Sequence, residues 1–272
     1  MTAVQLRPAP TPALSLAVRA RDVLAFEWTK LRSLRSNHIT LAAAAIVTLG
    51  ASVVVGRALS AVHKPLPGGF PALNGTFLAY AEYTVIPISV LAVLQFTSEY
   101  GTGLIRTTFA AVPQRWAVLA GKAAVVGAAA LVIGEVLAFA SFSVVQAMVS
   151  GGHRGLSLAQ PGVTGAVLAG GFVLCACALT AVGMGAIIRS TPGAIVATLV
   201  AIYLLASLCL VLPSPWQNEI GRFTMAFAAY QVTAQHPQAG LFSPWASMLV
   251  LVAWPAAALL AAGLTLSRRD AG

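Results

Sequence analysis

Charged residues are scarce in this chain. Only 8% of its 272 residues are Asp, Glu, Lys or Arg, whereas 58% are hydrophobic, and the mean hydropathy is +0.86. This composition excludes an ordinary soluble domain, because too few polar side chains exist to cover a globular surface. The chain is therefore predicted to lie in a bilayer, with membrane lipid as a partner.

Acidic residues are rarer than basic ones. The seven Asp and Glu against 16 Lys and Arg give a net charge of +9. A basic balance is typical of nucleic-acid-binding proteins, but here the basic residues lie at the edges of apolar runs and form no stripe with aromatic residues. Lys and Arg are enriched in the cytoplasmic loops of membrane proteins, which explains the excess without a nucleic-acid partner.

The residues that enzyme chemistry needs are also missing. Cys175, Cys177 and Cys209 lie inside apolar runs without C-x-x-C spacing, so they are interpreted as small hydrophobic side chains. The histidines are scattered, and the sequence contains no H-E-x-x-H, G-x-S-x-G or G-x-x-x-x-G-K-[ST] pattern. We therefore predict that the chain is not an enzyme and carries no catalytic residue, no metal site and no cofactor.

Long apolar runs predict an all-α, multi-pass membrane protein. An α-helix of about 17 to 20 residues crosses roughly 30 Å of hydrocarbon. Residues 1–15 contain several prolines and are predicted to be a disordered tail, followed by a single transmembrane domain at 16–272. The six predicted transmembrane helices span about residues 39–56, 76–97, 120–149, 162–188, 193–212 and 245–266.

Two further helices are expected outside these spans. Between Leu16 and Ser36, apolar residues gather on one arc of a helical wheel, with basic residues at its flanks. Such a helix lies along a membrane surface, although a cytosolic helix packed on another domain is an alternative. Within the long 213–244 loop, a short helix is predicted from Glu219 to Val232.

The distribution of Lys and Arg orients the chain. Most of the 16 basic residues lie on the side that carries both termini and the connection between the second and third spans. Because cytoplasmic loops are enriched in Lys and Arg, both termini are predicted to be cytoplasmic, in the inner (plasma) membrane. The opposite side keeps only Arg57, Lys64, Arg154 and Arg222.

The connection between the second and third spans mixes charged with apolar side chains. Residues 98–112 have the pattern of a short amphipathic helix that presses an apolar ridge into a groove of a soluble partner, with a plain solvated loop as the alternative. Gly101 and Gly103 are expected to permit a tight bend before it. The predicted partner-binding residues are Glu99, Tyr100, Gly103, Leu104, Arg106, Phe109, Pro113 and Arg115.

At three places the sequence resembles the permease subunits of type-2 ATP-binding-cassette (ABC) exporters. These are E-Y-G-T-G at 99–103 with the basic residues that follow, E-W-T-K-L-R-S at 27–33, and R-R-D at 268–270. The resemblance implies that residues 98–112 are a coupling helix that docks on a separate ATPase subunit, which would hold ATP and Mg. It also implies a second permease chain, in a homodimer or heterodimer, and export of an unidentified substrate.

Two acidic residues, Glu82 and Glu135, lie inside apolar runs at a similar expected depth, about 20 Å from the cytoplasmic edge. A carboxylate within a membrane costs a few kcal/mol, so it is expected to face the bundle interior or a cavity. With Tyr83 and Gln146 they are candidates for a substrate route, and each is equally well interpreted as a neutral group hydrogen-bonded between helices. Two other functions stay open: a proton-coupled secondary transporter, and a non-transporting anchor or assembly protein.

Overall fold

The computed structural model of the chain describes residues 16–61, 72–112, 114–149, 155–213, 215–234 and 237–268. Within these ranges, the side chains at 16–20, 72–79, 81, 82 and 111 are not described. The predicted tail at 1–15 therefore lies outside the described residues. The described part contains helices and connections but no strand, which confirms the all-α class.

Five helical stretches of the described residues are long and apolar enough to cross a membrane: α2, α5, α6, the continuous α7–η2–α8 stretch, and α11. The predicted span at 76–97 lies within α3, and its membrane crossing stays a prediction. The helices are α1 (Leu16–Ser33), α2 (Arg35–Ala61), α3 (Ala72–Thr102), α4 (Leu104–Ala111), α5 (Arg115–Val149), α6 (Val163–Ile188), α7 (Thr191–Leu199), the π-helix η2 (Val200–Leu204), α8 (Leu205–Leu210), α9 (Trp216–Gly221), α10 (Met225–Thr233) and α11 (Pro244–Arg268).

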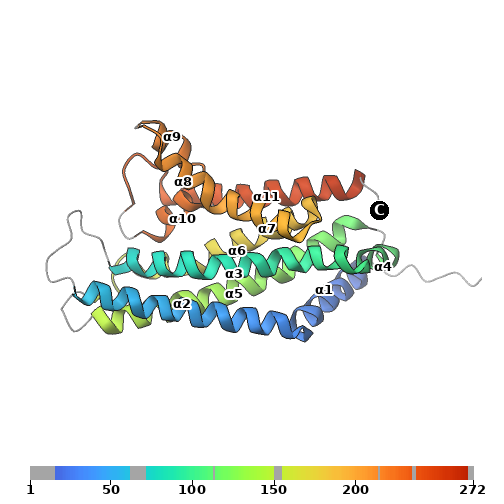
Figure 1. The fold of residues 1–272 in the computed structure, drawn as a ribbon, viewed down its shortest axis with the longest axis horizontal. Helices are drawn as coiled ribbons and strands as arrows, with labels where there is room; N and C mark the ends of the chain where they lie inside the picture. The colour runs from blue at the N-terminus through green and yellow to red at the C-terminus, as the bar shows by residue number, and fades with distance from the viewer. Residues whose placement is uncertain are drawn as a thin grey trace, which may run out of the picture.

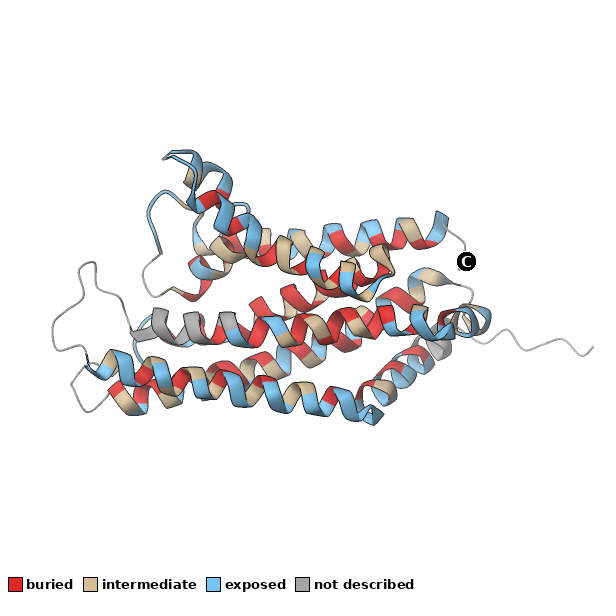
Figure 2. Cartoon of the chain, viewed as in Figure 1, coloured by how far each residue is buried: buried red, intermediate tan, exposed pale blue. Residues whose placement is uncertain are grey.

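The long helices run side by side along one axis, with α6 at the centre of the packing (Figure 1). Helix α6 packs against α3, α5 and α11, and Leu174, Ala178 and Val182 along it are completely buried. A helix that is apolar on every side is expected in such a central position. The outward faces of α2 and α11 are exposed by contrast, as expected for surfaces that meet lipid (Figure 2).

Helix α1 leaves the axis of α2 at a sharp corner (Figure 1). The corner falls at Leu34, where the side chain of Asn37 donates a hydrogen bond to the carbonyl oxygen of Leu31 at 3.0 Å. The backbone N–H of Asn37 donates to the carbonyl oxygen of Leu34 at 3.1 Å. Asn37 thus satisfies backbone groups that the end of a helix leaves unpaired, and α1 ends at Ser33 rather than continuing to residue 36.

The apolar arc predicted for α1 divides into two faces in the structure. Val23 and Leu31 are buried against the bundle, whereas Leu24, Trp28 and Leu34 are exposed. The helix therefore packs along one side and keeps a second apolar strip available for lipid. Its placement at the membrane surface stays a prediction.

The predicted coupling segment is built from two helices. Residues 98–102 form the last turn of α3, Gly103 adopts a left-handed conformation with φ of 73°, and α4 starts at Leu104. Glycine suits this position because it reaches positive φ without steric cost. Gly103 therefore makes the predicted bend, whereas Gly101 lies inside α3 and does not. Helix α4 lies at the same end of the molecule as α1 and the C-terminal end of α11 (Figure 1).

The predicted helix at 219–232 is two short helices, α9 and α10. Thr224 separates them: its extended backbone starts α10, and its hydroxyl accepts a hydrogen bond from the N–H of Phe227 at 3.4 Å. A threonine at this position is a typical helix N-cap. The indole N–H of Trp254 in α11 donates to the carbonyl oxygen of Phe223 at 2.9 Å and holds this region against the bundle.

Helices α6 and α11 approach each other most closely where α6 has a glycine. A Cβ atom placed on Gly183 would lie 2.7 Å from the Cβ of Ala258 and 2.8 Å from its backbone carbonyl carbon. Backbone atoms cannot move aside as a flexible side chain can. Small residues at such contacts let transmembrane helices pack closely.

We expect the substitution Gly183→Ala to lower the free energy of unfolding in mild detergent by about 1 to 3 kcal/mol, because the added methyl group overpacks the contact. The matched control is Gly50→Ala on α2, where a Cβ would meet nothing within 4 Å. The control should be neutral or slightly stabilising, since alanine favours a helix more than glycine does. Equal thermal unfolding temperatures for the two variants would contradict this packing.

Candidate functional site

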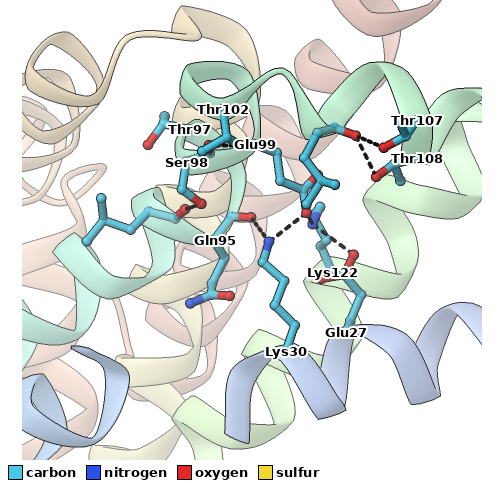
Figure 3. Close-up of polar contacts among 12 residues, drawn as sticks. Glu27, Lys30, Gln95, Thr97, Ser98, Glu99, Thr102, Thr107, Thr108 and Lys122 are labelled. Carbon is cyan, nitrogen blue, oxygen red and sulfur yellow. Dashed lines mark hydrogen bonds and ion pairs between the residues drawn. The ribbon is translucent and has the colours of Figure 1, made fainter. Parts of the chain in front are cut away.

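Four charged side chains meet at the end of the bundle that carries α4 (Figure 3). Glu27 and Lys30 come from α1, Glu99 from α3 and Lys122 from α5. The Nζ of Lys122 lies 2.5 Å from Oε1 of Glu99 and 2.8 Å from Oε1 of Glu27. The Nζ of Lys30 lies 2.6 Å from the same Oε1 of Glu99. These four residues, named the charge cluster below, join three helices.

The charge cluster is almost completely removed from solvent. The side chains of Lys122, Glu99 and Glu27 are 0%, 1% and 4% exposed, and that of Lys30 is 13% exposed. Buried charges are tolerated only when they are paired, and two cations against two carboxylates make the cluster neutral. Burial, followed by the nearby positive charge of Lys122, lowers the pKa of Lys30 from its usual value.

Neutral polar groups extend the charge cluster to the corner between α1 and α2. Lys30 also donates to the backbone carbonyl oxygen of Gln95 at 3.2 Å. The side-chain amide of Gln95 donates to Oδ1 of Asn37 at 3.4 Å, and Asn37 caps the end of α1 as described above. One connected set of polar contacts therefore links α1, α2, α3 and α5.

The local sequence of α1 places Glu27 in the interior. Val23, Glu27 and Leu31 are spaced by four residues, so they share one helical face, and all three are buried. Close packing with α5 supports this face, because a Cβ on Gly121 would lie only 2.5 Å from Cγ1 of Val23. The glycine thus lets α1 approach α5 immediately before Lys122.

Sequence reasoning missed the charge cluster. Glu27 entered the sequence analysis only as part of the stretch 27–33, and Lys122 was not predicted as a site residue. The signal that could have found Glu27 is its position, four residues from Val23 and four from Leu31 on the apolar stripe. A carboxylate on a buried stripe needs a cation, and Lys122 is the basic residue that interrupts the apolar start of α5.

Glu99 was predicted to lie on the docking surface, but in the structure its side chain is buried in the interior. Its carboxylate is 1% exposed and is bound by Lys30 and Lys122, so it does not face a soluble partner. The spacing in sequence could not show this, because Glu99 belongs to the last turns of α3 and not to α4. Pro113 lies outside the described residues.

The other predicted partner-binding residues lie at or near the surface. Leu104 is 41% exposed and Arg106 is exposed, both on α4. Tyr100 is half-buried, and the guanidinium of Arg189 lies 5.1 Å from the centre of its ring. Between Leu104 and Arg106, Ile105 is only 3% exposed and fixes α4 to the core. Helix α4 is therefore amphipathic as predicted.

Arg115 connects the start of α5 to the end of α11. It donates to the backbone carbonyl oxygen of Leu266 at 2.6 Å, and its guanidinium lies 5.5 Å from the ring centre of half-buried Phe109. A cation is favourable at the C-terminal end of a helix, where carbonyl groups are left unpaired. Beside it, the ring of Trp116 occupies the space that a side chain at Gly263 would need.

The structure does not gather the predicted substrate-route residues into one site. Glu135 and Gln146 both lie on α5, three turns or about 16 Å apart. Oε1 of Gln146 accepts a hydrogen bond from the N–H of Leu156 at 2.7 Å, so this side chain holds the connection that follows α5. Tyr83 is 47% exposed. The side chain of Glu82 lies outside the described residues.

The described residues include a small cavity in the interior. A cavity of about 20 Å³ lies between α1, α2, α3 and α5, which is space for roughly one water molecule. Among the same residues, no three His, Cys, Asp or Glu side chains lie together as metal ligands would. The chemistry available at the charge cluster is therefore ion pairing and mechanical connection.

The chain matches no family model, no curated protein and no solved structure. Its function must therefore be inferred from the geometry of its own residues and from the sequence resemblance described above.

We expect Lys122→Met to lower the free energy of unfolding by about 3 to 5 kcal/mol, because two buried carboxylates then share one remaining cation, Lys30. Chemical unfolding in mild detergent measures the change. The matched control is Arg21→Met, which removes an exposed cation of α1 and should change stability by less than about 0.5 kcal/mol.

A second substitution tests whether charge imbalance is the cause. Combining Lys122→Met with Glu27→Leu leaves Glu99 and Lys30, whose charged atoms lie 2.6 Å apart, as one balanced pair. The double variant should regain much of the lost stability, since the uncompensated carboxylate is gone. A double variant that is less stable than Lys122→Met alone would show that packing, not charge, dominates.

Proposed function

We propose that this chain is the membrane-spanning permease subunit of an ABC exporter. A separate ATPase subunit holds ATP and Mg and docks on α4, and the chain moves its substrate out across the inner membrane. The sequence patterns at 27–33, 99–103 and 268–270 support this proposal through their resemblance to type-2 exporter permeases. A second permease chain completes the pathway.

The observation that carries the proposal is the connection between an exposed helix and a buried charge cluster. Helix α4 presents Leu104 and Arg106 outward, while Ile105 anchors it in the core. At its start, Gly103 joins it to α3 only four residues after Glu99. A partner that moves α4 therefore pulls on the ion pairs that hold α1, α3 and α5 together.

This connection gives a physical route for coupling ATP hydrolysis to the membrane helices. Coupling requires a partner whose two states contact α4 differently. The rigid contacts of the charge cluster then pass a displacement to three helices at once, rather than letting α4 move alone. The route is proposed from contiguous contacts, and measured coupling would establish it.

The docking surface also indicates the chemistry of the partner. Exposed Leu104 and Trp116 offer apolar and aromatic anchors, and exposed Arg106 adds positive charge. Aromatic residues and arginine are enriched among the residues that dominate binding energy at interfaces. The ATPase subunit is expected to present an apolar groove with an acidic rim.

A proton-coupled transporter is the second candidate function, and Glu135 favours it. This carboxyl group lies in a membrane-spanning helix, and its Oε2 is buried without a hydrogen-bond partner among the described residues. Intramembrane carboxyl groups of this kind serve as proton sites in transporters. Such a transporter would work without an ATPase partner, which separates it from the first proposal.

We expect the tagged native chain, purified in mild detergent, to recover an ATPase from its host membrane. Replacing Leu104 with Ser and Arg106 with Ala should weaken this association by about 30-fold or more, the effect of losing one dominant interface contact. ATPase activity in the eluate and thermal unfolding of the chain are both measured, and the unfolding temperature should not change.

The matched control is Leu158→Ser combined with Arg57→Ala. Leu158 is 40% exposed, close to the 41% of Leu104, and Arg57 is an exposed arginine at the end of α2. Both lie at the end of the bundle opposite α4, so ATPase recovery should equal that of the native chain. No ATPase with a folded native chain would rule out the exporter and favour the proton-coupled transporter.

A further inference from the structure

Glu135 places a carboxyl group at a depth where the other described spans carry no charged side chain. At 1.5 Å per residue it lies about 20 Å beyond Lys122 and about 21 Å before Val149, the end of α5. Other charged side chains on the described spans, including Lys122, lie within about two turns of a helix end. A carboxyl group at this depth is costly to keep, so it calls for a specific partner.

The carboxyl group of Glu135 lies in a gap that a glycine leaves open on α6. A Cβ on Gly171 would lie 2.5 Å from Oε1 and 2.6 Å from Cδ of Glu135. Its Oε2 is buried and has no hydrogen-bond partner among the described residues. Nearby, the hydroxyl of buried Tyr80 donates to the backbone carbonyl oxygens of Gly134 at 3.2 Å and Gly170 at 3.1 Å, which fixes the approach of the two helices.

The helix faces next to Glu135 and Gly171 carry exposed apolar side chains. Leu131 and Val132 on α5 are 40% and 63% exposed, and Leu168 on α6 is 48% exposed. These residues lie within one turn of Glu135 or Gly171 on the same helix faces. Glu135 itself is only partly buried, so these apolar residues border the exposed part of its side chain on the bilayer side.

A second copy of the chain does not supply the missing positive charge. Among the described residues, no Lys, Arg or His lies near the middle of a membrane span. A copy packed against these helix faces at the same depth would therefore bring no basic side chain from the described spans. A positive group on a small molecule in the bilayer would complement the carboxyl group.

We propose that Glu135 binds the positive group of a lipophilic organic cation, which enters between α5 and α6 from the bilayer. The carboxylate pairs with the charge, and Leu131, Val132 and Leu168 contact the apolar body. The absence of a side chain at Gly171 leaves room for the carboxyl group. The claim that such a cation is the transported substrate rests on the proposed exporter function. The claim that it binds at Glu135 does not.

Equilibrium dialysis of the purified chain in lipid nanodiscs tests the site with two probes. Tetraphenylphosphonium is a lipophilic cation, and triphenylphosphine oxide is a neutral molecule of similar shape. Glu135→Gln should bind tetraphenylphosphonium at least about tenfold more weakly than the native chain, with binding of the neutral probe unchanged. Glu135→Asp keeps the charge and should retain most of the affinity.

The matched control is Glu219→Gln, which makes the same change of charge at an exposed position in α9. It should bind both probes as the native chain does. Thermal unfolding confirms that each variant is folded. If Glu135→Gln is not folded, the test is the comparison of the two probes on the native chain and on Glu135→Asp. The proposal is overturned if the native chain does not prefer the cation, or if Glu135→Gln binds it as the native chain does.

The result of the dialysis experiment is independent of the result of the ATPase experiment. Cation binding through Glu135 without a recovered ATPase would retain the site and reject the exporter. A recovered ATPase with unchanged binding in Glu135→Gln would retain the exporter and reject the site.

Discussion

Lys122 is 0% exposed, and its ammonium group is held by carboxylates from two other helices, Glu27 of α1 and Glu99 of α3. Taking an ion out of water costs several kcal/mol, so each partner must stay in place for the others to remain buried. The position of α1 against the bundle and the end of α3 both depend on this arrangement.

The buried acidic side chains differ in whether a cation lies next to them. Glu27 and Glu99 are balanced by lysines near the end of the bundle, where they hold helices together. Glu135 lies deeper, against Gly171, and among the described residues no cation accompanies it. The balanced charges fit a mechanical role next to α4, and the unbalanced carboxyl group fits the proposed role in binding a molecule from outside the protein.

Apolar runs predicted the helices well, because the thickness of the hydrocarbon sets the length of a span. The predicted helices at 162–188 and 245–266 are observed as Val163–Ile188 and Pro244–Arg268. Polar stretches were predicted less well. The segment at 98–112 is divided by Gly103, and the helix at 219–232 is divided at Thr224. A helix cap or a left-handed backbone depends on a single residue, whereas a helical pattern is judged over many residues, so the pattern does not show these breaks.

Composition and helical period alone identify a helical membrane protein with few charges, basic residues gathered toward one side, and an amphipathic segment after its second apolar run. Those properties follow from composition and from the period of an α-helix, which are local. Which charges are buried follows from the packing of the helices. Glu27, Glu99 and Lys122 lie far apart in the chain and meet where three helices pack. The physical reason is that the cost of a buried charge depends on its neighbours in space, and adjacent residues in the sequence do not specify them.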